Sequence, residues 1–596
     1  MGLFDALARE TTYITAVTRT LIGMRDVRPD GTHTIVDIVA ERARHSPDAI
    51  AFYHLDSTMS YGALNAAADR VAHWAHGAGV GRGDAVALLM DNRPQFVAAW
   101  LGVLKVGAVA ALINTNLRGA ALAHSIAISG ARHAIVGAEL DEAFLQVAAQ
   151  IAQRPTGWRD GGAVAGMENL DAALAAAPAT AADPSWRDGV TCADKAFYIY
   201  TSGTTGLPKA SNFTHLRMLY MMHGFAGGLN AKASDRMYNV LPLYHSAGGV
   251  CALGPALLTG GSVILKHKFS VHEFWGDVHR YEATLFQYIG ELCRYLLNAP
   301  TSRFEHDHKV RAITGNGLRP EIWATFQQRF AIPKIIEFYG ATEGNVSMLN
   351  YDGKVGAVGR VPSYMRAIMQ TRIVKFDIER EEPVRGFDGC CIECQVGEVG
   401  EVIGKISAQP GRSFEGYTRQ SDSEKKILRD VFAPGDAWFR TGDLMRRDAQ
   451  GYFYFIDRIG DTFRWKGENV ATSEVAEALG VVSGVREANV YGVNVPGTDG
   501  RAGMAALVTI PEFEIAKLAQ VLADRLPNYA RPVFVRLLPA IEITGTFKHR
   551  KLELVRDGFD PDHVRDPLYW FDPDTAQYES LTSDVYKAIV AGKIKL

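Results

Sequence analysis

The sequence predicts an α/β protein with a large N-terminal domain of doubly wound sheets, a small β-barrel-like subdomain and a smaller α+β C-terminal domain. Up to residue 339, uniformly apolar strand patterns alternate with helical ones, which is typical of parallel sheets covered on both faces. Past residue 370 the predicted strands are short, alternating and rich in glycine, which indicates a small antiparallel sheet or barrel. After Asp457 and Arg458 a separate α+β pattern follows.

The composition excludes several classes of protein. The chain has 596 residues, too many for one hydrophobic core, of which 47% are hydrophobic and 22% charged. This ordinary globular mix excludes a disordered chain, a coiled coil and a polytopic membrane protein. The 63 Lys and Arg residues do not outnumber the 66 Asp and Glu residues, so we expect no nucleic-acid partner. Six cysteines are too few for a disulfide framework and indicate a reducing compartment, the cytoplasm.

Residues 1–34 are expected to form a separate N-terminal helical segment. Apolar residues recur at loosely helical spacing between positions 3 and 22, with Arg9, Arg19 and Arg25 nearby. Two interpretations remain open: a helix that lies at a membrane surface, and a terminal helix that docks on the core. The segment lacks the long apolar stretch of a cleavable signal peptide.

A first sheet is expected after a helix that begins at Ile35, with strands over 85–90, 106–112 and 133–137. The stretch from Phe96 to Ile113 is long enough to cross a membrane. Because its pattern splits at a glycine, we expect a helix over 95–104 that leads into a buried strand over 108–113. Residues 155–190, rich in Ala, Gly and Pro, are expected to be a connecting segment.

The remaining elements are expected in the following order. The predicted strands are 197–200, 263–265, 285–288, 335–339, 397–406, 451–456, 487–491 and 503–510, and the predicted C-terminal helices are 472–479 and 515–525. We place a domain boundary near 457–461, which divides the rest of the chain into a domain over 35–457 and a domain over 458–596.

The strongest chemical signal is a run of hydroxyl and glycine residues that follows the strand ending at Tyr200. The run reads Thr201-Ser202-Gly203-Thr204-Thr205-Gly206-Leu207-Pro208-Lys209. Glycines let the backbone approach a ligand, successive amides form an anion-binding nest, and the lysine adds a positive charge. The run suits a nucleotide triphosphate. It is not a Walker A loop, because Pro208 stands where that motif needs glycine and Ala210 stands where it needs Ser or Thr.

Four further stretches combine glycine with hydroxyl, aromatic or acidic residues at the end of an apolar run. They are 314–318 (Thr-Gly-Asn-Gly-Leu), 338–345 (Phe-Tyr-Gly-Ala-Thr-Glu-Gly-Asn), 441–444 (Thr-Gly-Asp-Leu) and 454–461 (Tyr-Phe-Ile-Asp-Arg-Ile-Gly-Asp). Each is weak alone, but their order after the hydroxyl-rich run is specific.

In these motifs the sequence resembles the adenylate-forming superfamily, which contains acyl- and aryl-CoA synthetases, firefly luciferase and the adenylation domains of peptide synthetases. The resemblance runs from about residue 35 to the end of the chain. Three stretches, 339–345, 457–470 and 543–551, are similar to the branch of fatty acid transport proteins and very-long-chain acyl-CoA synthetases. The resemblance implies a mobile C-terminal domain and the substrates ATP, CoA and a fatty acid.

The resemblance also implies a role for each motif residue. The β- and γ-phosphates would be cradled by Thr201, Ser202, Gly203, Thr204, Thr205, Gly206 and Lys209. Adenine would be held by Gly315, Asn316, Tyr339 and Gly340. Mg²⁺ would be ligated by Glu343 and Thr204, with Thr342 close to the phosphates. The ribose would be bound by Asp443, with Arg458 nearby, and Lys548 would bridge the carboxylate and the α-phosphate.

Three positions leave alternatives open. Gly460 stands at the hinge position, where many relatives carry Asp or Lys, and supplies dihedral freedom without a side chain. Thr546-Phe547 precedes Lys548 where most of the superfamily has Ser-Gly, so Lys551 is the fallback for the adenylation lysine. His245 either lines the acyl and CoA passage or is a satisfied core histidine.

The implied reaction is the ligation of a long-chain or very-long-chain fatty acid to CoA. The carboxylate attacks the α-phosphorus to give acyl-adenylate and pyrophosphate, and the CoA thiol then displaces AMP. Alternatives on the same fold are an aryl- or bile-acid-CoA ligase, an acyl-AMP ligase, and an uptake protein that traps fatty acid as its CoA ester. We expect a cytoplasmic protein, with contact to the inner face of the cell membrane and a homodimer left open.

Overall fold

The computed structural model describes residues 3–201, 207–378, 380–407, 409, 413–466, 468–498, 500–541 and 551–596. The chain divides into two compact units, and each is described by itself. Unit 1 comprises residues 1–360 and 405–428, and unit 2 comprises residues 361–404 and 429–596.

Unit 1 contains two sheets whose central strands are parallel. In the first sheet the order is β7 (Glu168–Asn169), β6 (Thr156–Asp160), β5 (His133–Gly137), β3 (Ala85–Leu89), β4 (Val109–Leu112), β8 (Lys195–Thr201) and β9 (Lys209–Thr214). In the second it is β15 (Ser347–Asn350), β14 (Ile335–Gly340), β13 (Ala312–Asn316), β12 (Leu285–Ile289), β10 (Arg236–Asn239), β11 (Ser262–Leu265), β1 (Ile50–His54) and β2 (Ser57–Ser60). Antiparallel pairs occur at β8–β9, β14–β15 and β1–β2.

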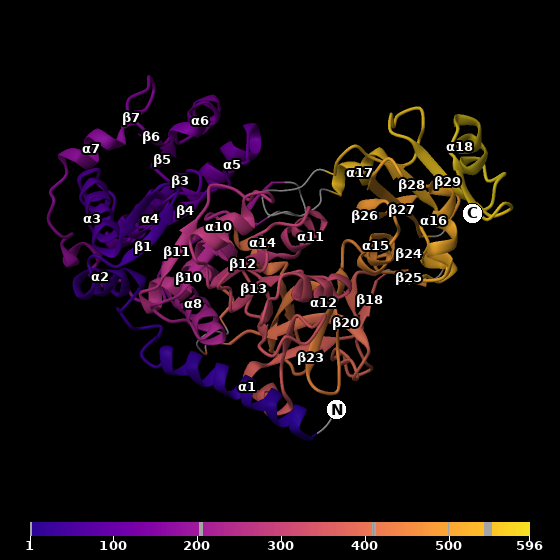
Figure 1. The fold of residues 1–596 in the computed structure, drawn as a ribbon, viewed down its shortest axis with the longest axis horizontal. Coiled ribbons are helices and arrows are strands. Elements are labelled where there is room, and N and C mark those ends of the chain that lie inside the picture. Colours follow the sequence, from indigo (N-terminus) through magenta and orange to yellow (C-terminus); the bar gives the residue numbers. More distant parts are fainter. Residues whose placement is uncertain are drawn as a thin grey trace. The chain divides into compact units, whose positions relative to one another are not determined.

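Helices separate the strands along the chain, as the sequence pattern predicts (Figure 1). They are α2 (Ile35–His45), α3 (Tyr61–Gly77), α4 (Pro94–Lys105), α5 (Gly119–Ser129), α6 (Asp141–Ala148), α7 (Leu170–Ala176), α8 (His215–Leu229), α9 (Leu253–Thr259), α10 (Phe274–Arg280), α11 (Gly290–Asn298), α12 (Pro320–Arg329) and α14 (Gln420–Glu424).

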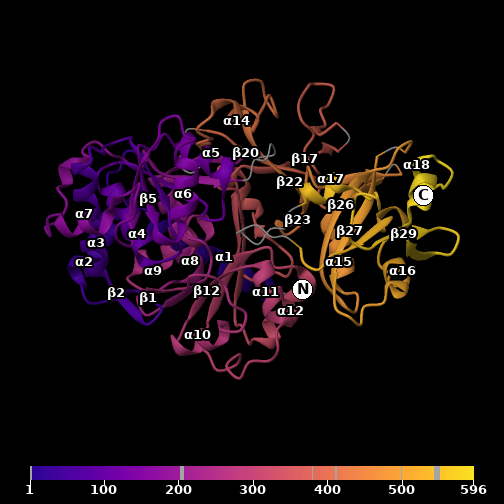
Figure 2. The same ribbon diagram turned by 90° about the horizontal axis from the view of Figure 1, so that it is seen from above.

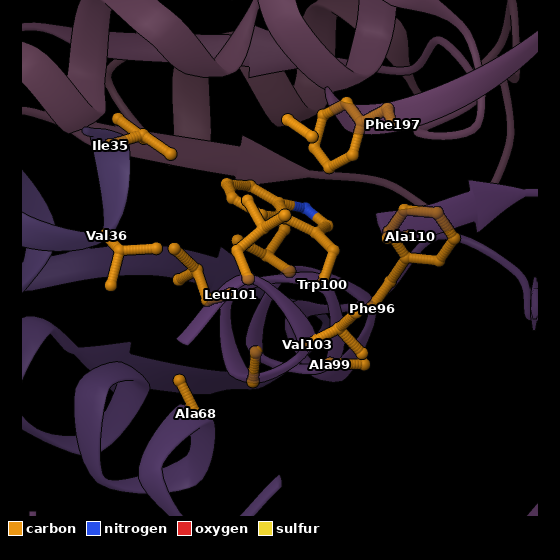
Figure 3. Packing of buried hydrophobic residues seen from close by; sticks show 14 of the residues in the cluster. Ile35, Val36, Ala68, Phe96, Ala99, Trp100, Leu101, Val103, Ala110 and Phe197 are labelled. Carbon is orange, nitrogen blue, oxygen red and sulfur yellow. The ribbon is translucent and has the colours of Figure 1, made fainter. Parts of the chain in front are cut away.

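The stretch that is long enough to cross a membrane is a buried helix and strand, α4 and β4, which confirms the prediction. Trp100 of α4 is buried and meets the Phe197 ring edge-on, with ring centroids 5.3 Å apart (Figure 3). Lys105 is buried too, and its ammonium lies 2.5 Å from a carboxylate oxygen of Asp69, so the charge is paired. Among the described residues, no helix combines the length and apolar character needed to cross a bilayer.

The prediction that residues 155–190 are only a connecting segment is wrong. This stretch adds β6 and β7 to the first sheet and contributes α7. β6 pairs in parallel with β5, and its Trp158 stacks edge-on against Trp74, with ring centroids 5.2 Å apart. The strand lacks an apolar run, so its position at the outer part of the sheet was not visible in the hydrophobic pattern.

The N-terminal helix α1 (Leu3–Gly23) docks on α8, which supports the docking interpretation for one of its faces. Tyr13 and Ala16 are buried, with the Tyr13 ring edge-on to that of Tyr351, and Arg19 donates to the Gly227 carbonyl of α8 at 3.0 Å. The opposite face is exposed and carries large apolar side chains among threonines. Its large side chains are Phe4, Leu7, Ile14, Leu21 and Ile22, each between 52% and 85% exposed.

Unit 2 contains two main antiparallel layers. The first includes β17 (Thr371–Val374), β20 (Val399–Lys405), β22 (Ala437–Arg447) and β23 (Tyr452–Arg458), which confirms the small antiparallel sheet. The second has the order β26 (Val485–Asn494), β27 (Arg501–Thr509), β28 (Phe534–Leu537), β29 (Leu568–Asp572) and β30 (Gln577–Ser580), with only β27–β28 parallel. Its helices are α15 (Thr472–Gly480), α16 (Ile515–Ala523), α17 (Leu552–Asp557) and α18 (Ser583–Val590) (Figure 2).

Candidate functional site

The hydroxyl-rich run connects β8 to β9 in unit 1. β8 ends at Thr201 and β9 begins at Lys209, and these two residues are partners across the antiparallel pair. The predicted phosphate residues Ser202, Gly203, Thr204, Thr205 and Gly206 lie outside the described residues. The two described ends of the run, Thr201 and Lys209, are therefore side by side.

Glu343, the predicted magnesium ligand, is joined to Thr201, the first residue of the run, by a tyrosine that the sequence did not reveal. The Tyr417 hydroxyl donates to Glu343 Oε1 at 2.8 Å and also hydrogen-bonds the Thr201 side chain. Burial and the Glu343 carboxylate raise the pKa of Tyr417, so it is a neutral donor. Tyr417 reaches this place because its neighbours pair with β9: the Thr418 amide donates to the Ala210 carbonyl at 2.9 Å.

Lys209 has an acidic partner in the same unit. Its ammonium lies 2.9 Å from Asp422 Oδ1 and 5.6 Å from the centroid of the Tyr417 ring. Both charged side chains are largely buried. A negatively charged ligand of Lys209 would therefore compete with the Asp422 carboxylate. Asp422 stands on α14, more than 200 positions further along the chain, and no sequence pattern indicated it.

A second cation, Arg217, contacts the backbone close to Glu343. Arg217, in the first turn of α8, donates from Nη2 to the Ala341 carbonyl at 2.6 Å. Burial lowers the pKa of Arg217 to about 10, while the carboxylates of Glu343 and Glu415 act to raise it. The guanidinium thus remains charged at neutral pH and holds the backbone two residues before Glu343.

The predicted adenine residues come together at one edge of the second sheet. Gly315 and Asn316 end β13, and Tyr339 and Gly340 end β14. The two strands are parallel neighbours, so their carboxyl ends meet at the same edge, which is where open α/β sheets bind ligands. Gly315 cannot carry a side chain, because a Cβ there would lie 2.3 Å from the Tyr288 carbonyl oxygen.

His245 is half-buried, in a segment that contacts the residues following β14. Its ring centroid is 5.0 Å from that of Tyr244, whose hydroxyl accepts from the Asn116 amide at 2.9 Å. The next residue, Ser246, has its hydroxyl 3.4 Å from that of Thr342. A π-helix over Ala247–Cys251 follows, a distortion that is frequent at functional sites. His245 is thus beside Thr342, and its role in an acyl or CoA passage stays a prediction.

The other predicted residues lie in unit 2. Asp443 and Arg458 face each other across β22 and β23, with Arg458 Nε 3.7 Å from Asp443 Oδ1. Gly460 follows in the turn after β23, where a Cβ would meet no atom within 4 Å. The turn therefore does not require glycine for space, and the hinge role stays a prediction. Lys548 lies outside the described residues.

The fallback lysine is described and is engaged in unit 2. Lys551 Nζ lies 3.1 Å from Asp461 Oδ2 and donates to the Thr472 hydroxyl at 3.0 Å. Thr472 in turn donates to the buried Asp457. These contacts link Lys551 directly to Asp461 and, through Thr472, to Asp457, the carboxylates on either side of Gly460. The contacts of Lys551 therefore stabilise the segment around Gly460.

The two domains of one family account for most of the sequence. The AMP-binding enzyme family matches residues 39–408, and the AMP-binding enzyme C-terminal domain matches residues 474–548. Among curated relatives, long-chain fatty acid transport protein 2 from Rattus norvegicus is 42% identical over 96% of this chain and 93% of the relative. Long-chain fatty acid transport protein 1 from Mus musculus is 42% identical over 94% of this chain and 88% of the relative.

Solved structures share the fold. An anthranilate CoA ligase in complex with anthranoyl-AMP superposes with a TM-score of 0.74 at 21% identity, covering 88% of this chain and 96% of that one. A benzoate CoA ligase from Burkholderia xenovorans LB400 gives a TM-score of 0.72 at 22% identity, covering 88% of this chain and 100% of that one. These likenesses confirm the predicted fold class.

The chain belongs to the AMP-binding enzyme family. Its relatives place it in the group of long-chain fatty acid transport proteins, which confirms the branch that the sequence motifs indicated. The activity that this membership brings is the AMP-forming ligation of a carboxylic acid to CoA, with ATP as the second substrate.

Proposed function

We propose that this protein is a Mg²⁺- and ATP-dependent ligase that joins a long-chain or very-long-chain fatty acid to CoA. The observation that carries the proposal is the arrangement of Thr201, Lys209 and Glu343 around Tyr417. It brings together a hydroxyl, a cation and a carboxylate in unit 1, which are the groups that a magnesium triphosphate needs. The names of the relatives supply the acyl chain class.

The donor set in unit 1 suits magnesium. Mg²⁺ prefers hard oxygen ligands, and Glu343 presents a carboxylate oriented by the Tyr417 hydroxyl. Glu343 would hold the ion together with Thr204, and the bound ion would neutralise charge on the phosphates. Lys209 would contact the phosphates after exchanging its Asp422 partner.

The first half-reaction brings two anions together. The fatty acid carboxylate and ATP repel each other, so Lys209 and Lys548 must screen their charges while the carboxylate oxygen attacks the α-phosphorus. A bond forms between the carboxylate oxygen and phosphorus, and the bond from phosphorus to the pyrophosphate oxygen breaks. Tyr339 would stack on adenine, and Asp443 would accept hydrogen bonds from the ribose hydroxyls, with Arg458 beside it.

The second half-reaction releases AMP. The CoA thiol releases its proton to solvent, its sulfur attacks the acyl carbonyl carbon to form the thioester bond, and AMP leaves with the electron pair of the broken acyl–oxygen bond. We place the acyl and CoA passage beside His245 and the hinge for the change between half-reactions at Gly460, with the domain boundary near 457–461.

A substrate panel tests the proposal. The full chain is assayed for AMP release with fatty acids of graded length, with cinnamate and with cholate, each with and without CoA. We expect CoA-dependent AMP release with long-chain and very-long-chain acids. Preference for cinnamate or cholate would favour the aryl- or bile-acid-CoA ligase, and AMP release that does not need CoA would favour an acyl-AMP ligase.

We also propose that the protein is cytoplasmic and contacts the inner face of the cell membrane through α1. The apolar side chains opposite the docked face of α1 form a stripe along the helix, defined here as Phe4, Leu7, Ile14, Leu21 and Ile22. A helix with one docked face and one apolar exposed face suits the interface of a bilayer, where the fatty acid substrate also dissolves. Uptake by trapping of acyl-CoA would follow from ligation at this surface. A homodimer stays a prediction, which light scattering tests.

A further inference from the structure

The buried carboxyl group of Glu337 contacts the turn that we propose to face adenine. This turn, residues 315–318, comprises the last two residues of β13 and the two residues that follow. Glu337 stands opposite Gly315 on the neighbouring strand β14, and its side chain is almost fully inaccessible, 2% exposed. None of the roles described above uses Glu337. A buried carboxyl group without a role is unusual, because its desolvation is costly unless its oxygens are hydrogen-bonded.

The carboxyl group of Glu337 binds the turn through two consecutive amides. The Gly317 amide and the Leu318 amide both donate to Glu337 Oε1, the second at 3.2 Å. The other oxygen, Oε2, shares a hydrogen bond with the hydroxyl of Tyr288, which is itself fully buried on β12. Tyr288 therefore fixes the carboxyl group through Oε2, and the carboxyl group fixes the turn through the two amides bound to Oε1.

The opposite side of the turn is closed by backbone. A Cβ on Gly290 would lie 1.6 Å from the Gly317 carbonyl oxygen, so α11 begins in direct contact with the turn. Gly317 has a φ of +81°, a left-handed conformation that glycine adopts without strain. The turn is thus wedged between Gly290 and Glu337, and the hydrogen bonds of Glu337 fix the amides after Asn316.

We propose that Glu337 is a positioning residue for nucleotide recognition, which holds the 315–318 turn in the conformation that receives adenine. The proposal rests on the proposed function only in taking this turn as the adenine site. It predicts that the length of the side chain at position 337 controls the affinity for the adenosine part of the nucleotide and leaves the phosphate part unaffected.

The test uses two substitutions and a matched control. Glu337→Asp shortens the side chain by one methylene and withdraws the oxygen from the two amides, whereas Glu337→Gln keeps an acceptor in place. Asp277→Asn is the control, because Asp277 is another buried carboxylate that accepts from a tyrosine hydroxyl, that of Tyr238, in the same unit. Binding of adenosine and of inorganic pyrophosphate to each purified full chain is measured by calorimetry.

We expect Glu337→Asp to weaken adenosine binding at least about fivefold, because two amides lose their acceptor. Pyrophosphate binding should remain within about twofold, and Glu337→Gln and Asp277→Asn should bind both probes like the wild type. Unchanged adenosine affinity in Glu337→Asp overturns the proposal, as does an equal loss for adenosine and pyrophosphate, since that marks a general defect.

A second variant and a binding readout ensure that the experiment decides the role of Glu337. If Glu337→Asp does not fold, Tyr288→Phe replaces it, because removal of the phenol frees Oε2 and loosens the same carboxyl group, with the same supporting and contradicting outcomes. The measurement is of binding and not of turnover. A wild-type chain that binds adenosine but forms no acyl-CoA would therefore contradict the proposed function while leaving the role of Glu337 to be decided by its own variants.

Discussion

At the scale of single residues, the candidate site depends on how the charge of Glu343 is arranged. Tyr417 donates a hydrogen bond to its carboxylate, and the Arg217 guanidinium holds the backbone nearby. A hydrogen bond to a charged group contributes about 1.5–3 kcal/mol, more than one between neutral groups. The orientation of Glu343 is therefore the property of the site most sensitive to a single substitution.

Tyr417→Phe should raise the Mg²⁺ concentration needed for half-maximal activity about tenfold, because Glu343 loses the donor that orients it. The measurement is a magnesium titration of pyrophosphate exchange at fixed ATP. Tyr578→Phe serves as the control, since it removes another buried phenol, one that donates to the Pro532 carbonyl in unit 2. An unchanged magnesium requirement in Tyr417→Phe would show that this phenol does not orient a metal ligand.

The pH dependence of stability should report the protonation of Glu337. Burial raises the pKa of Glu337 to about 8 from an ordinary value of 4.5, so between these values the folded chain keeps a proton that the unfolded chain has lost. Folding stability then falls as pH rises through this window, by at most about 1.4 kcal/mol per pH unit. The titratable groups that face Glu337 are Tyr288 and Cys293, and burial raises the pKa of both, so they stay neutral throughout.

Glu337→Gln removes this proton, and other groups contribute equally to both chains. The free energy of unfolding of Glu337→Gln should therefore increase relative to that of the wild type as pH is raised from 5 to 8. Denaturant titration at each pH measures this difference. A constant difference between the two chains across this range would mean that Glu337 is ionised in the folded protein.

At the scale of elements, the sequence predicted those helices and strands whose positions follow from the hydrophobic pattern and the spacing of glycines. The helix that ends at Lys105 and the buried strand after it were predictable because a continuous apolar run broke at Gly107. Strand β6 was not, because it joins the sheet by backbone pairing without an apolar run of its own. The roles of Tyr417 and Glu337 were hidden for a related reason: their partners lie far along the chain, and only the pairing of strands brings them together.

The exposed stripe of α1 is predicted to be the lipid contact of the protein. Replacing Leu7, Ile14 and Leu21 together by Ser should reduce flotation of the protein with liposomes by at least about tenfold, because each apolar side chain contributes to burial in the interface. Thermal stability should stay close to that of the wild type, since these side chains face away from α8. Phe387→Ser is the control, as it removes an exposed apolar side chain outside α1. Equal flotation of the triple variant and the wild type would exclude α1 as the lipid contact.

At the scale of the whole molecule, the central question is which lysine serves the first half-reaction. Sequence resemblance assigns this role to Lys548, with Lys551 as the fallback. The structure gives Lys551 two partners within unit 2, Asp461 and Thr472, and these contacts suit a residue that stabilises the segment around Gly460. A lysine committed to such contacts is poorly placed to bridge a carboxylate and a phosphate, so the two lysines should have separable effects.

Lys548→Ala should abolish pyrophosphate exchange with fatty acid and ATP while sparing thioester formation from supplied acyl-adenylate and CoA. This split is expected because the first half-reaction joins two anions and needs the cation, whereas the second starts from an adenylate already formed. Lys551→Ala should retain pyrophosphate exchange and lower the unfolding free energy by about 1 kcal/mol, the contribution of a partly exposed ion pair. If Lys551→Ala loses exchange and Lys548→Ala keeps it, the assignment passes to Lys551, and the contacts with Asp461 and Thr472 would then have to break before adenylation.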